Sequence, residues 1–350
     1  MSDPIKGRGA QFNTANKFLR QQNVREHVEA IDEWETPAPK TQFLEIEAAS
    51  LVNKVESPDV AMQYSMNPYN GCEHGCIYCY ARNTHEYWGY SAGLDFESKI
   101  MVKHNAPKLL RKFLEHTKWQ GAPLSLSGNT DCYQPAEKKY RLTRSLIEIC
   151  AAYNQPVGVL TKNAGVLRDM DLLAPMAAKG IAAVMLSLTT LNEDLRRVLE
   201  PRTATAIQRI RTLESLSKAG IPTGVMLGPM IPGINKHELP ALLEAAANAG
   251  ATFAGYTFVR LNGSVKLLFH QWLHQHFPDR ADKVWHLIES GHGGKVNDSD
   301  FGRRMRGEGL IADMIAIQFR NHCRKLGLNK EKLRLDSSQF FRPGQQGSLF

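Results

Sequence analysis

Short apolar runs alternate with longer segments of helical periodicity through the middle of the chain. The apolar runs are rich in residues that favour strands, whereas the longer segments repeat their apolar positions every three or four residues. The runs predict strands near 61–67 and at 124–127, 156–161, 182–187, 223–227 and 253–259. The longer segments predict helices at 106–117, 138–152, 166–179, 204–219 and 236–249. Three of these helices end beside Gly180, Gly220 or Gly250, and glycine commonly follows the last residue of a helix.

Regular alternation of strands and helices predicts a parallel sheet with helices outside it, either as a barrel or as a doubly wound sheet. In both architectures the functional side chains gather at the C-terminal ends of the strands. Residues 1–60 are polar and irregular, so we expect them to form an N-terminal extension. The alternation covers residues 61–262 and stops there, so we expect residues 263–350 to form a C-terminal extension.

The composition narrows the class of protein. The chain has 350 residues, of which 43% are hydrophobic, and this excludes a mainly disordered protein. No segment approaches the roughly 18 consecutive apolar residues that a membrane-spanning helix needs, and no apolar run follows the first charged residues. We therefore expect a cytoplasmic protein with no membrane partner. The net charge is +8, and most of it lies from residue 260 onward, where 15 basic and 9 acidic residues occur.

Three of the six cysteines, Cys72, Cys76 and Cys79, lie within eight residues of each other. Clustered cysteines in a cytoplasmic chain indicate metal or redox chemistry rather than a disulfide framework. Three thiolates in a glycine-containing loop can bind three irons of a four-iron cluster and leave the fourth iron open to a substrate. The alternative is a structural zinc site completed by His74 or His85, because zinc takes sets of three cysteines and one histidine.

The pattern Cys-x-x-x-Cys-x-aromatic-Cys at the end of a first strand resembles the signature of the radical S-adenosylmethionine (radical SAM) superfamily. The flanking residues, Asn-Pro-Tyr-Asn-Gly at 67–71 and Tyr-Ala-Arg at 80–82, resemble the branch related to spore photoproduct lyase. This resemblance implies an α/β fold, a partial parallel (β/α)6 TIM-like barrel over residues 61–262 with N- and C-terminal extensions.

The same resemblance implies two cofactors, a 4Fe-4S cluster on the three cysteines and S-adenosylmethionine (SAM) on the open iron. The cluster would then cleave SAM reductively to a 5′-deoxyadenosyl radical, which abstracts hydrogen from the substrate. A flavodoxin- or ferredoxin-type protein is the expected electron donor.

Two residues, Tyr78 and Ser187, receive a SAM-binding role from the resemblance, and a third, Arg202, receives one from its position at the start of a helix. Tyr78, at the aromatic position of the motif, is expected near the adenine, and Ser187, at the end of the fourth strand, near the ribose hydroxyls. Arg202, near the start of the helix at 204–219, is expected to pair with the SAM carboxylate. The alternatives are a packed tyrosine for Tyr78 and a surface arginine for Arg202.

The loop after the second strand carries Ser127, Gly128, Asn129 and Asp131. In the superfamily this position holds a motif that binds the SAM amino group, so the resemblance assigns these four residues to that group. A tight turn that caps the next helix explains the same residues structurally. The thiol of Cys132 is a candidate donor of a hydrogen atom to a product radical, with inert burial as the alternative.

Two features of the C-terminal extension predict macromolecular partners. Arg303, Arg304 and Arg306 lie between glycines, with aromatic residues upstream, and can contact a nucleic-acid backbone, although a solvated charged surface is the alternative. The last residues, Gln346 to Phe350, resemble the short peptide by which bacterial DNA-handling proteins bind the sliding clamp. A frayed terminus is the alternative.

These observations together predict a radical SAM enzyme. Damaged DNA is the substrate class implied by the branch resemblance alone. The other readings are a radical SAM enzyme that modifies a protein or small molecule, a non-catalytic iron-sulfur or zinc protein that binds nucleic acid, and an adaptor bound to the sliding clamp.

Overall fold

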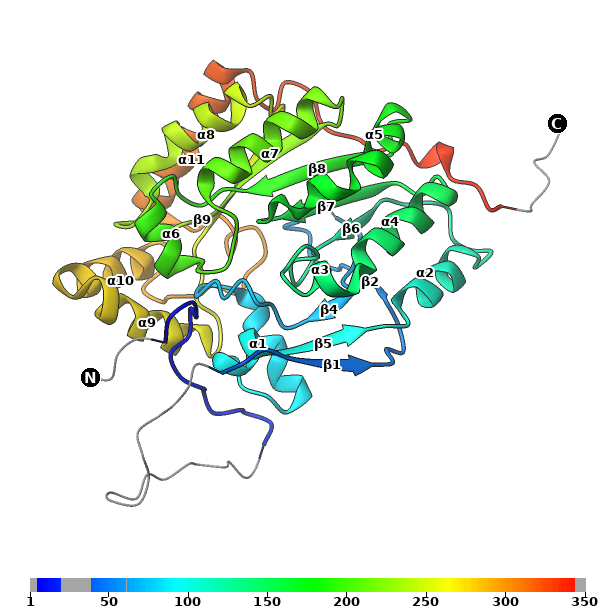
Figure 1. The fold of residues 1–350 in the computed structure, drawn as a ribbon. Helices are drawn as coiled ribbons and strands as arrows, with labels where there is room; N and C mark the ends of the chain where they lie inside the picture. The colour runs from blue at the N-terminus through cyan, green and yellow to red at the C-terminus, as the bar shows by residue number, and fades with distance from the viewer. Residues whose placement is uncertain (1–4, 20–38, 61, 344–350) are drawn as a thin grey trace.

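A seven-stranded sheet forms the centre of the molecule, in a computed structural model that describes residues 5–19, 39–60 and 62–343 (Figure 1). Six of its strands are parallel, and they lie side by side in the order in which the chain reaches them. They are β3 (Tyr64–Met66), β6 (Leu124–Leu126), β7 (Val157–Thr161), β8 (Ala182–Ser187), β9 (Thr223–Met230) and β10 (Phe253–Phe258). A doubly wound sheet would reverse this order at a switch point, so the sequential order confirms the barrel-type prediction.

The barrel is partial because the sheet keeps two edges within the described residues. One edge is β10, and the other is β2 (Val52–Lys54), which pairs antiparallel with β3. All six predicted strands are present, with boundaries that agree to within three residues.

The predicted helices cover the outer side of this sheet (Figure 1). They are α2 (Ala106–Leu114), α4 (Leu142–Ala152), α5 (Met170–Ala178), α7 (Ala206–Lys218) and α8 (Leu239–Asn248). Short 3-10 helices, η2 (Ala164–Asp169) and η3 (Lys236–Glu238), precede α5 and α8. The segment predicted as a single helix at 138–152 is divided into α3 (Glu137–Tyr140) and α4, because Arg141 between them has a positive φ of 51°.

The main core lies between the sheet and these helices, and its side chains are the apolar positions that set the sequence periodicity. The three glycines predicted after helices, Gly180, Gly220 and Gly250, all have positive φ. Two features exclude a side chain at Gly250. Its φ is +89°, and a Cβ would lie 2.2 Å from the hydroxyl oxygen of Ser217.

A second, three-stranded sheet lies beside the barrel and was not expected from the sequence. It consists of β1 (Gln42–Ile46), β5 (Lys99–Lys103) and β4 (Tyr69–Asn70), with β5 in the middle. The 3-10 helix η1 (Tyr80–Trp88) and α1 (Leu94–Ser98) lie between β4 and β5 in the chain. Since β4 ends two residues before Cys72, its pairing with β5 determines where the cysteine loop begins.

The chain after the barrel is mostly helical. Its elements are α9 (Val265–His276), η4 (Pro278–Arg280), α10 (Ala281–Ser290), α11 (Gly309–Leu326) and η5 (Ser337–Gln339). Within the barrel, a further short helix, α6 (Glu193–Leu199), follows β8. Helix α11 packs against α8 and β10. The three-part division at residues 60 and 262 stays a prediction, and the clamp-like peptide at 346–350 lies outside the described residues.

The described helices include none with the length and apolar character needed to cross a membrane.

Candidate functional site

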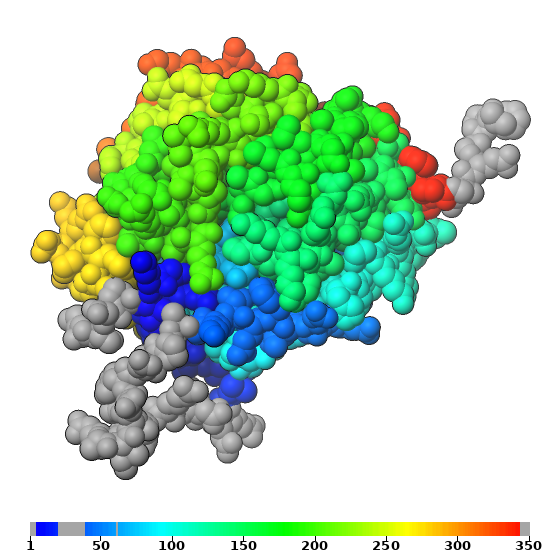
Figure 2. All heavy atoms as spheres, in the orientation of Figure 1, coloured from blue at the N-terminus to red at the C-terminus, as the bar shows by residue number. Residues whose placement is uncertain are grey.

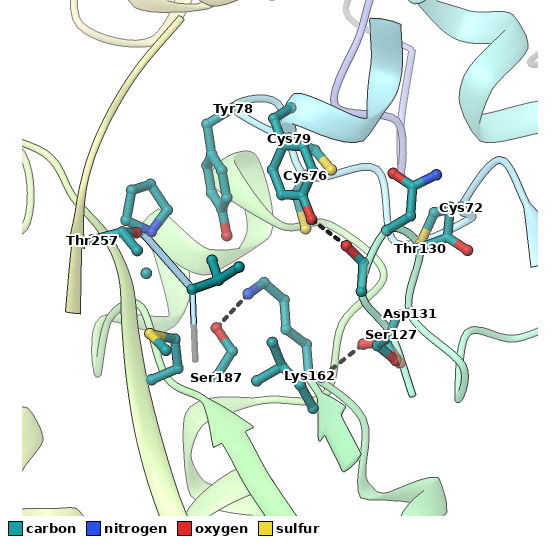
Figure 3. A pocket seen from close by; sticks show the side chains of 18 of the residues that line it. Cys72, Cys76, Tyr78, Cys79, Ser127, Thr130, Asp131, Lys162, Ser187 and Thr257 are labelled. Atoms are coloured by element: carbon teal, nitrogen blue, oxygen red, sulfur yellow. Dashed lines mark hydrogen bonds between the residues drawn. The ribbon is translucent and has the colours of Figure 1, made fainter. Parts of the chain in front are cut away.

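The three clustered cysteines lie on one loop and line a single cavity (Figure 3). The backbone N–H of Cys72 donates to the carbonyl of Phe96 at 2.9 Å, and that of Ile77 donates to Leu199 at 3.1 Å. All three thiols are free of disulfide bonds. The loop therefore presents three unpaired sulfur atoms to the same space.

A fully buried ion pair between Arg82 and Glu97 holds the cysteine loop in place. The guanidinium of Arg82 donates to the carbonyl oxygens of Cys76 at 2.9 Å and Gly75 at 3.1 Å, and it pairs with Glu97. Both side chains of the pair are inaccessible to solvent. Because an arginine donates in a fixed planar arrangement, Arg82 holds the two carbonyls, and with them the loop, in one orientation.

The segment of residues 7–10, which we call the N-terminal strap, lies against the outside of this loop. The backbone N–H groups of Gly9 and Ala10 donate to the Glu97 carboxylate at 3.1 and 2.8 Å. A Cβ on Gly9 would lie 1.8 Å from the carbonyl oxygen of Gly75. Residues 8–10 are themselves buried, and Figure 2 shows the dark-blue part of the chain that includes the strap between the yellow helices and the green part of the barrel. The strap thus reaches the cysteine loop at backbone-to-backbone contact distance.

The chemistry of the three sulfur atoms fits a cationic cluster. Burial raises the pKa of Cys72, Cys76 and Cys79 above the ordinary thiol range, so the protein alone does not stabilise three thiolates. Iron supplies the missing positive charge, and three cysteines bind three corners of a 4Fe-4S cluster.

The zinc alternative requires His74 or His85 as a fourth ligand beside the three cysteines. His74, proposed as a fourth ligand, is held by Asp131 at 3.3 Å and by Asn163 at 3.3 Å. His74 is therefore engaged by other side chains and is not free to complete a zinc site.

The cavity lies at the C-terminal ends of the parallel strands, where the barrel fold places functional residues. Its volume is about 410 Å³, within the usual range for a small-molecule site. Strands β6 to β10 and the loops that follow them contribute Ser127, Asp131, Thr161, Lys162, Ser187, Gly228 and Thr257 to its wall. Figure 3 shows several of these side chains pointing into the same space as the cysteines.

A charged network forms the wall next to the cysteines. Lys162 donates to the hydroxyl of Ser187, and its Nζ lies 3.8 Å from Glu200. Burial alone would raise the pKa of Glu200, but the charges of Arg209 and Lys162 outweigh it and lower the pKa to about 2. The hydroxyl of Tyr78 also donates to Glu200. The ionised Glu200 therefore orients both Tyr78 and Lys162 at the cavity wall.

Sequence reasoning missed Lys162, Glu200 and Arg209. The signal for Lys162 was present, because it directly follows the strand predicted at 156–161 and so had to lie at the functional end of the barrel. Glu200 and Arg209 carried no such signal, since their pairing is visible only once α7 is placed beside the end of β8.

Asp131, assigned above to the SAM amino group, lines the cavity but is already bound by the protein. Its carboxylate accepts from the N–H groups of Tyr133 and Lys162, from the hydroxyl of Thr161, and from His74. Although burial opposes ionisation, the neighbouring His74 and these hydrogen bonds lower the pKa of Asp131 to about 2. Asp131 fixes the loop after β7, and its contact with SAM stays a prediction.

The other three residues of that group, Ser127, Gly128 and Asn129, also line the cavity. Ser127 has a positive φ of 70°, and its hydroxyl accepts from the N–H of Cys132 at 2.8 Å. The hydroxyl of Tyr80 donates to the carbonyl of Gly128 at 2.7 Å. The segment is thus a tight turn, which was the structural explanation offered from the sequence. It also faces the cavity.

Two predicted site residues do not reach the cavity. Arg202 is turned to the outside of the cysteine loop, where it donates to the carbonyl of Gly7 at 3.1 Å and lies 3.7 Å from Glu73. Its own N–H donates to the carbonyl of His74, which fixes this orientation. Cys132 is fully buried in the main core, and burial raises its pKa. Neither side chain lines the cavity, so the SAM carboxylate contact of Arg202 and hydrogen donation by Cys132 have no support in this structure.

Comparisons with known proteins agree with this site. The model of the radical SAM superfamily matches residues 66–246. An uncharacterized protein of Mycobacterium tuberculosis (strain ATCC 25618 / H37Rv) is 34% identical over 252 residues, which cover 71% of this chain and 74% of that protein. A radical SAM Nα-GlyT isomerase of Pseudomonas phage M6 is 26% identical over 231 residues, 65% of this chain and 46% of that protein.

Among solved structures, spore photoproduct lyase complexed with dinucleoside spore photoproduct is similar, with a TM-score of 0.60. The alignment covers 82% of this chain and 80% of that chain at 17% sequence identity. At this identity the similarity demonstrates a shared fold.

Proposed function

Because this chain belongs to the radical SAM superfamily, whose members bind a 4Fe-4S cluster and SAM, we propose that it cleaves SAM reductively and abstracts hydrogen from an organic substrate. One observation carries the proposal: three free cysteines on one loop face a cavity at the C-terminal ends of the parallel strands. When bound, the cluster supplies one electron to the SAM sulfonium, which releases methionine and a 5′-deoxyadenosyl radical.

The chain's own residues hold and orient the reactants. Cys72, Cys76 and Cys79 would bind the cluster, in a loop that the Arg82 and Glu97 pair keeps in place. The strap and the core bury this loop, which keeps bulk water away from the reacting atoms.

Lys162 replaces Arg202 in this proposal as the partner of the SAM carboxylate. Its ammonium lies on the cavity wall, and its positive charge acts on the Cys76 and Cys79 thiols, so it lies on the cysteine side of the cavity. Ser187 shares that wall and is available to the ribose hydroxyls, as predicted from the resemblance.

Damaged DNA is the substrate class that we propose first, with an external flavodoxin- or ferredoxin-type electron donor. The fold shared with spore photoproduct lyase supports this class, as does the excess of basic residues after residue 260. Two of the three arginines at 303, 304 and 306 are ion-paired, so their charges are less available to a nucleic acid than the sequence alone indicated. Arg303 is paired with Asp298, and Arg304 is paired with Asp59.

Formation of 5′-deoxyadenosine tests the proposal. The protein is reconstituted with iron and sulfide under anaerobic conditions, reduced, and supplied with SAM. We expect the wild-type chain and Cys323→Ala, a core cysteine outside the cavity, to form 5′-deoxyadenosine, and Cys76→Ala to form none. A fully loaded wild-type protein that forms no more product than Cys76→Ala would refute the proposed function.

A further inference from the structure

The cavity has a second end whose chemistry differs from that of the cysteine side. The cysteine side carries Asp131, Lys162 and Ser187. The other end is lined by apolar side chains from two separate parts of the chain: Val55, Val60 and Met62 before β3, and Met305 in the C-terminal extension. A cavity with a polar end and an apolar end has room for two different reactants.

The apolar end is enclosed by contacts between the two edges of the sheet. After β2, the Asp59 carboxylate accepts from the N–H of Gly302 at 2.6 Å and pairs with Arg304, which also donates to Ser57. The carbonyl of Met305 accepts from the N–H of Phe258 at the end of β10. These contacts, which we call the edge clasp, join the loop after β2 to the chain beside β10. The charges of Asp59 and Arg304 neutralise each other within it.

One charged side chain at this end has no partner. Arg260, two residues beyond β10, lines the cavity and is half-buried. Among residues 5–19, 39–60 and 62–343 its side chain has no hydrogen-bond partner and no carboxylate within 4.0 Å. Arg303 and Arg304 nearby are both ion-paired. A half-buried guanidinium without a counterion is unfavourable in the free protein, and an anionic ligand removes that cost.

The SAM carboxylate is not the anion that Arg260 lacks. In this family that carboxylate lies at the cluster, where Lys162 is the neighbouring cation whose charge acts on Cys76 and Cys79. The charged and titratable groups that act on Arg260 are instead Arg304, Tyr80 and Asp59. Arg260 therefore lies beside Asp59 and Arg304 of the edge clasp, whereas Lys162 acts on the cysteines.

We propose that Arg260 binds an anionic group of the substrate, a phosphate or a carboxylate, while the apolar part of the substrate lies against Met62 and Met305. A guanidinium matches both oxyanions through two parallel hydrogen bonds, and burial strengthens them. The inference rests on the proposed function, because it assigns the second end of the cavity to the molecule that loses hydrogen.

Three small probes test the proposal: phenyl phosphate, benzoate and the uncharged benzyl alcohol. Each is titrated calorimetrically into the cluster-loaded protein without reductant, once in the absence of SAM and once with saturating SAM. We expect at least one anion to bind the wild-type chain about tenfold more tightly than benzyl alcohol. A preference for phenyl phosphate identifies phosphate-bearing substrates, and a preference for benzoate identifies carboxylates; both support the proposal.

Substitutions identify Arg260 as the source of the preference. In Arg260→Met we expect the anions to bind no better than benzyl alcohol, whereas Arg260→Lys keeps part of the preference. Arg306→Met, which removes the same charge from an exposed position nearby, should match the wild type. Iron content and circular dichroism confirm that each variant is folded; because Arg260 has no hydrogen-bond or ion-pair partner within the described residues, its replacement breaks no such interaction there.

Three results would overturn the proposal. They are a wild-type chain without anion preference, an Arg260→Met chain that keeps the full preference, and an anion preference that disappears when SAM is added. The last would show that Arg260 belongs to the SAM site. Because the titration needs no SAM cleavage, its outcome is separate from the 5′-deoxyadenosine assay, and either claim can fail while the other stands.

Discussion

At the scale of single residues, the cavity depends on buried charges that hold one another in place. Glu200 is the clearest case, since it accepts from Arg209 at 2.6 Å and from Thr189 at 2.7 Å while orienting Tyr78. Turning Glu200 away would leave Arg209 buried without a counterion. The protein's own contacts therefore orient the wall beside the cysteines.

Removing the Glu200 charge should destabilise the fold strongly. Glu200→Gln keeps the shape but leaves Arg209 buried without a counterion, which costs about 3–5 kcal/mol. The measurement is the apparent Tm of the cluster-loaded protein under anaerobic conditions. The control, Glu214→Gln, removes an exposed pair with Lys218 and should cost less than about 1 kcal/mol. Equal Tm changes in the two variants would contradict a structural role for Glu200.

The same carboxylate has a defined pH signature. Its pKa in the folded chain, about 2, is below the ordinary value of 4.5, so its stabilising effect is complete above about pH 4.5 and is lost as the pH falls towards 2. We expect the Tm difference between wild type and Glu200→Gln to stay constant between about pH 8 and pH 6 and to shrink below about pH 4.5. A difference that already shrinks near neutral pH would assign the stabilisation to another group.

Single residues also show where sequence reasoning succeeded and where it failed. The three cysteines were predictable because their spacing alone identifies them. Arg202 was assigned to the cavity because helix starts attract anions, yet its N–H is bound to the carbonyl of His74 and its side chain turns outward to Gly7. The direction of one side chain in a turn depends on tertiary contacts that no local pattern contains.

At the scale of elements, the long periodic segments were predictable and the short ones were not. Every strand of the barrel had its own apolar run, but β4 has only two residues, and its partner β5 follows about thirty residues later. The sheet made by β1, β5 and β4 was therefore invisible in the sequence, although it determines where the cysteine loop begins.

The N-terminal strap belongs to the extension predicted at residues 1–60, but its contact with the cysteine loop was not predicted, and this contact can be tested at Gly9. Gly9→Ala places a Cβ 1.8 Å from a backbone oxygen that has little room to move, so the strap must shift away from the cysteine loop. We expect a loss of about 1–3 kcal/mol in stability and a lower iron content after gel filtration. Gly158→Ala, at a β7 position where a Cβ meets nothing within 4 Å, is the control. Full iron retention in Gly9→Ala would show that the strap does not support the loop.

At the scale of the whole molecule, the edge clasp compensates for a barrel that does not close. Its acid, Asp59, has a side chain only 6% exposed, while Arg304 is 19% exposed, so their contact is shielded from water. The partial barrel thus obtains a wall for the cavity without further strands.

Breaking the clasp should loosen both edges together. In Asp59→Asn we expect hydrogen–deuterium exchange to increase about tenfold in peptides that cover 55–60 and 302–305, because the charged hydrogen bonds to Gly302 and Arg304 are lost. Asp300→Asn, which removes an exposed partner of Arg303, should leave the exchange of residues 55–60 unchanged. If exchange in Asp59→Asn is unchanged at both segments, the edge clasp does not stabilise either edge of the sheet.

The central claim is that three cysteines bind three irons of a 4Fe-4S cluster and leave the fourth iron open to SAM at the cavity. Mössbauer spectroscopy of the 57Fe-reconstituted protein, recorded before and after SAM is added without reductant, tests this most directly. The account predicts that one of the four irons changes its spectrum on addition of SAM and that the other three do not. Four irons that remain equivalent in the presence of SAM would contradict it.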